Sequence, residues 1–201
     1  ATQTSTKIVV LAGPSGSGKS RLAERLGLPI LRLDDFYRDG DDPCLPRAFG
    51  IIDWDDPASW NHAAAVAAAR TLARDGVVEV PSYDIPTSRV VGTCSLHSQG
   101  SPIVVAEGIF AAEVITDLRE AGVLADAICL VHRPLVTFVR RLTRDLRESR
   151  KPPFTLLRRG WSLLRAEPQI VAHQIALGAV PRTPEQAYHR IQSLVRSATT
   201  V

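Results

Sequence analysis

The sequence predicts a three-layer α/β/α fold around a mainly parallel sheet, and two features of its pattern support this. Short apolar runs typical of buried strands recur at Lys7–Ala12, Ile30–Leu33, Val77–Val80, Ile103–Ala106 and Ala127–Val131. Helical patterns separate most of these runs, and crossover helices are what parallel strands require. The length of 201 residues suits one domain spanning residues 1–201.

Three helices are predicted along the chain. Asp56–Arg74 has Asp56 as its cap, Pro57 at its first position and Gly76 beyond its end. Ala111–Glu120 is closed by Gly122. Pro134–Arg150 has an apolar stripe opposite an arginine-rich face, and two prolines end it. Residues 154–178 look helical with an interruption near Pro168, and we expect the tail from Pro181 to be a loop with a short helix.

Composition indicates a soluble protein of the cytoplasm. No apolar run approaches the roughly 18 residues needed to cross a bilayer, so we expect no membrane partner. The three cysteines are widely spaced and odd in number, which argues against a disulfide framework or a zinc site. The net charge of +3 suits anionic ligands but does not by itself indicate nucleic acid.

The segment Gly13–Ser20, GPSGSGKS, matches the phosphate-binding pattern G-x-x-x-x-G-K-[ST] in full. It follows a predicted strand and precedes a predicted helix. Its glycines let backbone N–H groups approach phosphate oxygens, and the helix N-terminus favours an anion. We therefore expect ATP as the cofactor, bound by Gly13, Ser15, Gly16, Ser17, Gly18, Lys19, Ser20 and Arg21. We also expect Lys19 to be a catalytic group, because its ammonium can reach the outer phosphates.

Acidic residues follow two further segments, at the sheet edge where open α/β folds place ligands. Asp34, in Asp34-Asp35-Phe36-Tyr37, could orient an acceptor hydroxyl and take its proton, or the two aspartates could simply cap a loop. In Asp53-Trp54-Asp55-Asp56-Pro57, Asp56 is expected to cap a helix, which leaves Asp53 and Asp55 for a sugar diol or for solvent.

Glu107 ends the apolar run Ile103–Ala106. A buried acid is costly unless it is paired or close to a metal ion. We expect Glu107 and Ser20 to hold Mg²⁺ between them. In the predicted helix Pro134–Arg150, Arg141 and Arg144 are the candidates for stabilising charge on a moving phosphoryl group. No aromatic residues interleave with these arginines, so nucleic-acid binding is not favoured.

In this order, the motifs resemble those of the uridine kinase family of P-loop kinases. GPSGSGKS is similar to its phosphate loop, Asp34-Asp35-Phe36-Tyr37 to its Asp-Ser-Phe-Tyr, and Asp55-Asp56-Pro57 to its Asp-His-Pro. Pro81-Ser82-Tyr83-Asp84, Ala106-Glu107-Gly108-Ile109 and Arg141-Leu142-Thr143-Arg144-Asp145 resemble its later motifs. The resemblance implies a P-loop kinase with a small helical lid near residues 134–165. It makes Asp34 the base, Asp55 and Tyr83 substrate contacts, Glu107 a metal ligand, and Arg141 and Arg144 phosphate contacts.

The chain departs from this family after Tyr83-Asp84. The family's uridine and cytidine kinases carry a pyrimidine-reading histidine there, whereas this segment continues Ile85-Pro86-Thr87-Ser88-Arg89. We expect Arg89 to lie near the substrate. The predicted function is ATP-dependent phosphorylation of a small sugar-bearing molecule, first of all the 5′-hydroxyl of uridine or cytidine. Two alternatives stay open, a kinase for another acceptor such as pantothenate or a sugar phosphate, and a regulatory protein that binds ATP without transfer. Formation of a homo-oligomer also stays open.

Overall fold

A five-stranded parallel sheet forms the centre of the molecule in the computed structural model, which describes residues 6–48, 50–131 and 168–199. The strand order is β2-β7-β1-β8-β9, and every neighbouring pair is parallel. The bounds are β1 Lys7–Ala12, β2 Ile30–Arg32, β7 Ile103–Glu107, β8 Leu124–Leu130 and β9 Val180–Arg182. The predicted, mainly parallel sheet is confirmed.

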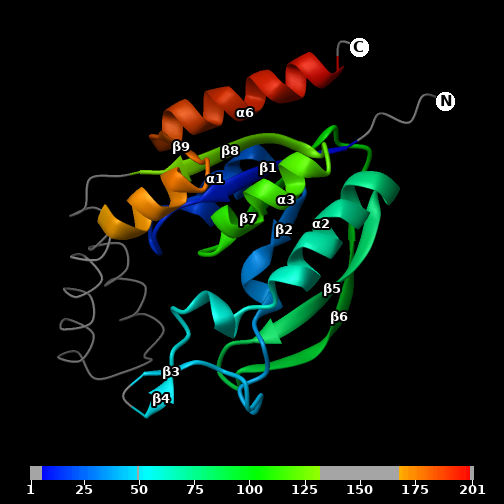
Figure 1. Cartoon of the computed structure of the whole chain (residues 1–201). Helices are drawn as coiled ribbons and strands as arrows, with labels where there is room; N and C mark the ends of the chain where they lie inside the picture. Colours follow the sequence, from blue (N-terminus) through cyan, green and yellow to red (C-terminus); the bar gives the residue numbers. More distant parts are fainter. Residues whose placement is uncertain (1–5, 49, 132–167, 200–201) are drawn as a thin grey trace.

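Helices cover both faces of this sheet, which gives three layers (Figure 1). Alternate residues of β1 show why. Ile8 and Val10 belong to one buried cluster, with α2 (His62–Asp75) and α3 (Ile115–Glu120). Val9 and Leu11 belong to the other, with α1 (Lys19–Leu26) and α6 (Pro184–Thr199). Successive side chains of a strand point to opposite faces, so an entirely apolar β1 needs cover on both.

The first predicted helix begins later than expected. Asp56 caps only a 3-10 turn, Pro57–Ser59, through the N–H of Ala58 at 2.8 Å. Trp60 then takes an extended conformation, with its indole N–H donating to Leu33 O at 2.7 Å. Asn61 caps α2 by accepting from the Ala64 N–H at 3.1 Å. The predicted Asp56 cap of this helix is therefore wrong, because the buried Trp60 interrupts the helical run.

Contrary to the prediction, the run Val77–Val80 does not join the parallel sheet. It belongs to β5 (Val77–Asp84), which pairs antiparallel with β6 (Arg89–His97) in a separate two-stranded sheet beside α2 (Figure 1). The largely exposed β6 shows no strong apolar pattern, so the sequence did not reveal it. A second short hairpin joins β3 (Arg47–Ala48) and β4 (Ile51–Ile52).

The C-terminal part is more regular than predicted. The tail forms β9 and then the 16-residue helix α6, rather than a loop with a short helix. Thr183 and Gln186 form a reciprocal cap at the start of α6, a signal that is readable in the sequence. Residues 168–176 are helical, and the 3-10 turn Ala111–Val114 leads into α3. The predicted helix Pro134–Arg150 and lid near 134–165 lie outside the described residues.

Among the described residues, no helix is long and apolar enough to cross a membrane.

Candidate active site

The phosphate loop connects β1 to α1, as the motif predicts. Gly13, Gly16 and Gly18 all have positive φ, at 147°, 82° and 93°. A Cβ on Gly13 would lie 2.8 Å from both Leu130 O and Ser17 Oγ, so only glycine fits there without a shift. Gly18 provides the N-cap of α1 and has no side chain to cover the first turn. The loop therefore has the backbone geometry that exposes N–H groups to an anion.

Lys19 is held over this loop. Its ammonium donates to Gly13 O at 2.8 Å and to Pro14 O at 3.2 Å, and the side chain is buried. A buried ammonium needs compensating partners, and a phosphate is one of the strongest. The donors of the loop and Lys19 together fit the phosphates of a nucleotide.

Ser20 and Glu107 face each other across the sheet edge. The hydroxyl of Ser20 donates to Glu107 Oε1 at 3.0 Å, although 87 positions separate the two residues. Burial raises the pKa of the Glu107 carboxyl, with Asp34 adding to the effect and Lys19 opposing it. A magnesium ion at a phosphate site takes one or two protein oxygens and completes its shell with phosphate and water. This hydroxyl and carboxylate supply such oxygens, so they fit Mg²⁺.

Asp34 lies in the 3-10 turn Leu33–Phe36 that follows β2. Its Oδ1 accepts from the backbone N–H of Ile109 at 2.9 Å. Gly108 makes this contact possible, because a Cβ there would lie 2.7 Å from the same oxygen. The charge of Asp34 also raises the pKa of Glu107. The structure therefore brings Asp34, Glu107 and the phosphate loop to one end of the sheet.

The neighbouring Asp35 has different surroundings from Asp34. Burial raises the pKa of its carboxyl, and the backbone N–H of Tyr83 acts in the opposite direction. Asp35 thus lies where the turn after β2 meets the β5–β6 hairpin. The sequence did not separate the roles of the two aspartates, since both fit the same motif.

Aromatic side chains form a wall beside Asp34. The ring of Tyr37 contacts those of Trp54, Tyr83 and Phe110, with centroids 5.7, 5.8 and 5.9 Å away. Burial raises the pKa of the Tyr37 phenol far above its ordinary value, and the charges of Asp34 and Asp55 add to this. Tyr37 therefore stays neutral. Tyr37 stands in the motif Asp34-Asp35-Phe36-Tyr37, but the sequence alone indicates no role for it.

Tyr83 is part of this wall and Asp55 lies near it, whereas Arg89 is placed differently. The charge of Asp55 raises the pKa of the Tyr37 phenol, so the Asp55 carboxylate lies close enough to act on this ring. The Tyr83 hydroxyl donates to Arg38 O at 3.2 Å. Arg89 makes an exposed ion pair with Asp41 at 2.6 Å, at the start of β6.

Two further sets of residues were predicted to belong to the site. Ser15, Gly16 and Ser17 form the middle of the loop, and Arg21 is exposed on α1. The hydroxyl of Ser17 is buried against Gly13, with no hydrogen-bond partner among the described residues. Arg141 and Arg144 lie outside the described residues.

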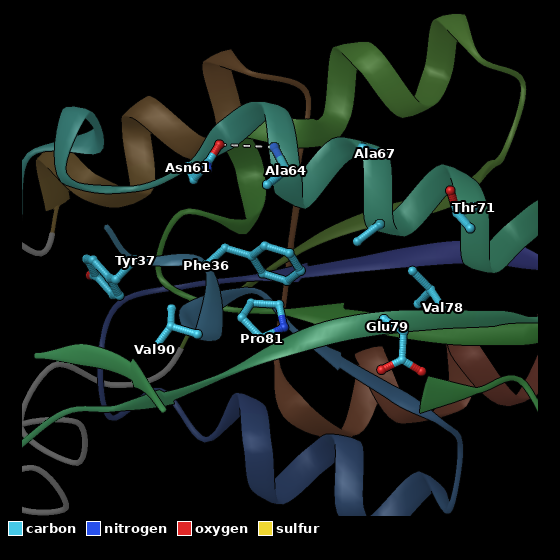
Figure 2. Close-up of a pocket in the computed structure, with 11 residues that line it drawn as sticks. Phe36, Tyr37, Asn61, Ala64, Ala67, Thr71, Val78, Glu79, Pro81 and Val90 are labelled. Carbon is cyan, nitrogen blue, oxygen red and sulfur yellow. Dashed lines mark hydrogen bonds between the residues drawn. The ribbon is translucent and has the colours of Figure 1, made fainter. Parts of the chain in front are cut away.

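A groove of about 480 Å³ runs between α2 and the β5–β6 hairpin (Figure 2). Small side chains on α2, such as Ala64 and Ala67, leave the space, and Val78, Pro81 and Val90 line the opposite side. Figure 2 shows Tyr37 at one end, so the aromatic wall and the groove share this residue. The mainly apolar lining suits an uncharged group rather than a phosphate.

Two curated proteins of Arabidopsis thaliana are similar to this chain. It is 32% identical over 155 residues to the protein named inorganic pyrophosphatase TTM1. It is 30% identical over 154 residues to inorganic pyrophosphatase TTM2. Each match covers 73% of this chain, which spans only about a fifth (22% and 21%) of the length of these relatives. No family model matches the chain.

Solved structures share the fold at low sequence identity. A proposed fructose transport system kinase from Silicibacter sp. TM1040 aligns with a TM-score of 0.61 and 17% identity, covering 86% of this chain and 87% of that one. The YGR205w protein aligns with a TM-score of 0.50 and 15% identity, covering 90% and 86%. A possible uridine kinase from Bacillus stearothermophilus reaches 0.48 at 17% identity over 68% and 76%, too low to support the uridine prediction. The chain thus has the three-layer fold of a P-loop kinase.

Proposed function

We propose that this chain is a kinase that transfers the terminal phosphoryl group of ATP to a hydroxyl of a small sugar-bearing acceptor. The observation that carries the proposal is the position of Asp34. Its carboxylate is fixed by the Ile109 N–H, at the same sheet edge as the Ser20–Glu107 pair and the phosphate loop. A protein that only binds ATP does not need a fixed carboxylate at this point.

The phosphate loop binds the nucleotide in this proposal. The backbone of Gly13–Ser20 and the Lys19 ammonium hold the phosphates, and Ser20 and Glu107 hold Mg²⁺. When bound there, the metal ion would supply positive charge that offsets the negative charge of the phosphates. Lys19 lowers the cost of the buried Glu107 carboxylate, so the ionised form is available as a ligand. The predicted Arg141 and Arg144 add positive charge on the phosphates.

Asp34 orients the acceptor hydroxyl and accepts its proton. A fixed base matters because phosphoryl transfer depends mainly on positioning and electrostatics. Asp55 binds two neighbouring hydroxyls of the sugar, and Tyr83 and Arg89 lie near the rest of the acceptor. The neutral Tyr37, whose pKa the charges of Asp34 and Asp55 both raise, belongs to the aromatic wall beside them. We propose uridine or cytidine as the first acceptors to test, with pantothenate-like compounds and sugar phosphates next.

One other function has a specific observation in its favour. The two curated relatives are named inorganic pyrophosphatases, so the same site could transfer a phosphoryl group to water. In that case Asp34 would orient a water molecule, and pyrophosphate would occupy the phosphate loop. The aromatic wall argues for an organic acceptor instead, because a water molecule needs no such surface.

Acceptor-dependent release of ADP from Mg·ATP tests the proposal. The panel contains uridine, cytidine, other nucleosides, pantothenate and ribose-type sugars, and phosphate release from pyrophosphate is measured in parallel. Turnover that needs an organic acceptor supports the kinase. Pyrophosphate hydrolysis without acceptor-dependent ADP release would replace it with the second function. ATP binding with neither reaction would indicate the regulatory alternative.

A further inference from the structure

A chain of hydrogen bonds connects Asp34 to two buried residues that no motif includes. The thiol of Cys129 donates to Gln174 Oε1 at 3.2 Å, and Gln174 Nε2 donates to Ile109 O at 3.3 Å. The N–H of Ile109 then donates to Asp34 Oδ1 at 2.9 Å. Both backbone polar groups of Ile109 are therefore hydrogen-bonded, the carbonyl to Gln174 and the N–H to Asp34.

Gln174 is placed where it can hold this segment firmly. It lies on the helix 168–176 and is only 3% exposed. Cys129 is fully buried in β8, where it pairs with Ala12, the residue before Gly13. Gln174 thus joins the strand beside the phosphate loop to the segment that orients Asp34.

The chemistry of each group matches its neighbour. Burial raises the pKa of the Cys129 thiol to about 11, so the thiol keeps its proton at neutral pH and can donate. The Gln174 amide then accepts from the thiol and donates to the carbonyl. A buried amide costs free energy unless both of its ends are bonded, and here both are. An apolar side chain would fill this site without that requirement, so stability alone gives no reason for a glutamine.

We propose that Gln174 is a positioning residue for Asp34, acting through the backbone of Ile109. Gln174 fixes the carbonyl of Ile109, which keeps the N–H of the same residue directed at Asp34. Cys129 in turn fixes the Gln174 amide. The catalytic part of this inference rests on the proposed kinase function, whereas the positioning part does not.

The test replaces Gln174 by methionine, which keeps the length and apolar volume but removes both hydrogen bonds. Gln192→Met is the matched control, because Gln192 is also a helical glutamine and its Nε2 donates to Tyr188 Oη at 2.7 Å on α6. Cys129→Val removes only the outer hydrogen bond, and it serves as a second variant if Gln174→Met folds poorly. Each protein is examined by amide hydrogen exchange at Ile109 and by steady-state kinetics.

We expect Gln174→Met to speed exchange of the Ile109 amide about ten-fold, and Gln192→Met to leave it unchanged. We expect kcat to fall about ten-fold in Gln174→Met, with the affinity for ATP kept. In an Asp34→Asn background the same substitution should have almost no further effect on kcat, because the two residues act in one chain. Cys129→Val should change both readouts in the same direction, by less.

Two results would overturn the inference. Unchanged Ile109 exchange in Gln174→Met would show that Gln174 does not hold this segment. An equal loss of kcat with and without the Asp34 carboxylate would show that Gln174 acts on something else. If no acceptor supports turnover, the proposed function fails, but Ile109 exchange still decides the positioning claim.

Discussion

Replacing Gly108 by alanine tests whether the position of Asp34 matters. A Cβ at Gly108 would lie 2.7 Å from Asp34 Oδ1 and 3.1 Å from Leu33 Cβ. The first distance is 0.7 Å shorter than the 3.4 Å at which ordinary contact begins. Gly108 has no positive φ, so alanine fits its backbone and the conflict falls on the carboxylate. Asp34 must therefore move by a large part of an ångström and weaken its bond to Ile109.

A displacement of about 1 Å in a catalytic group can cost about 100-fold in rate, so we expect kcat to fall about 30- to 100-fold. The free energy of unfolding should fall by only about 1–3 kcal/mol, as for other overpacked sites. The assay is acceptor-dependent ADP release, with urea unfolding measured on the same protein. Binding of Mg·ATP should change little, because the phosphate loop is untouched.

Gly92→Ala is the matched control for this substitution. Gly92 lies in β6, has no positive φ, and a Cβ there would meet nothing within 4 Å. We expect this variant to keep full turnover. The reasoning is refuted if Gly108→Ala, folded as well as Gly92→Ala, turns over acceptor at the same rate.

Three further predictions follow from other contacts. At pH 7 without metal, Glu107→Gln should have a higher free energy of unfolding than the parent, because burial raises the Glu107 pKa and makes its ionised form costly. In urea unfolding this gain should shrink and then vanish as the pH falls below 4.5, where the carboxyl is protonated in both the folded and the unfolded parent. The variant should also lack Mg²⁺-dependent turnover. Asn61→Ala should lower the free energy of unfolding by about 1 kcal/mol, because Asn61 caps α2; no change would contradict this cap. Arg89→Ala should cost less than about 0.5 kcal/mol, since its ion pair is exposed; a raised KM for the acceptor would reveal a substrate contact, and an unchanged KM would remove Arg89 from the site.

The sequence predicted the central sheet and the phosphate loop because local patterns determine both. An apolar run such as Lys7–Ala12 must be buried on both faces, and the spacing of Gly13, Gly18 and Lys19 is specific to one loop geometry. Asp34 and Glu107 could be placed together for a related reason. Asp34 follows the carboxyl end of β2 and Glu107 forms the carboxyl end of β7, and these ends meet at one edge of the sheet.

The features that sequence analysis missed depend on contacts between distant residues. Nothing local shows that Trp60 is held by Leu33, so the helix start was assigned to Asp56 rather than to Asn61. The residues of strand β6 are almost all exposed, because this strand pairs with β5 outside the core. It therefore lacks the apolar pattern of a buried strand. The contact between Asp35 and Tyr83 and the Gln174 chain likewise depend on the tertiary fold.

The most direct test of the account is acceptor-dependent ADP release by the parent protein and by Asp34→Asn, which keeps the shape of the side chain. Loss of a general base typically costs about 100- to 10,000-fold in rate, so we predict a fall in that range with Mg·ATP binding retained. The Ile109 N–H can still donate to the amide oxygen of the variant, so the fold should not change. Parental turnover by Asp34→Asn would contradict the central claim that this carboxylate takes the proton of the acceptor.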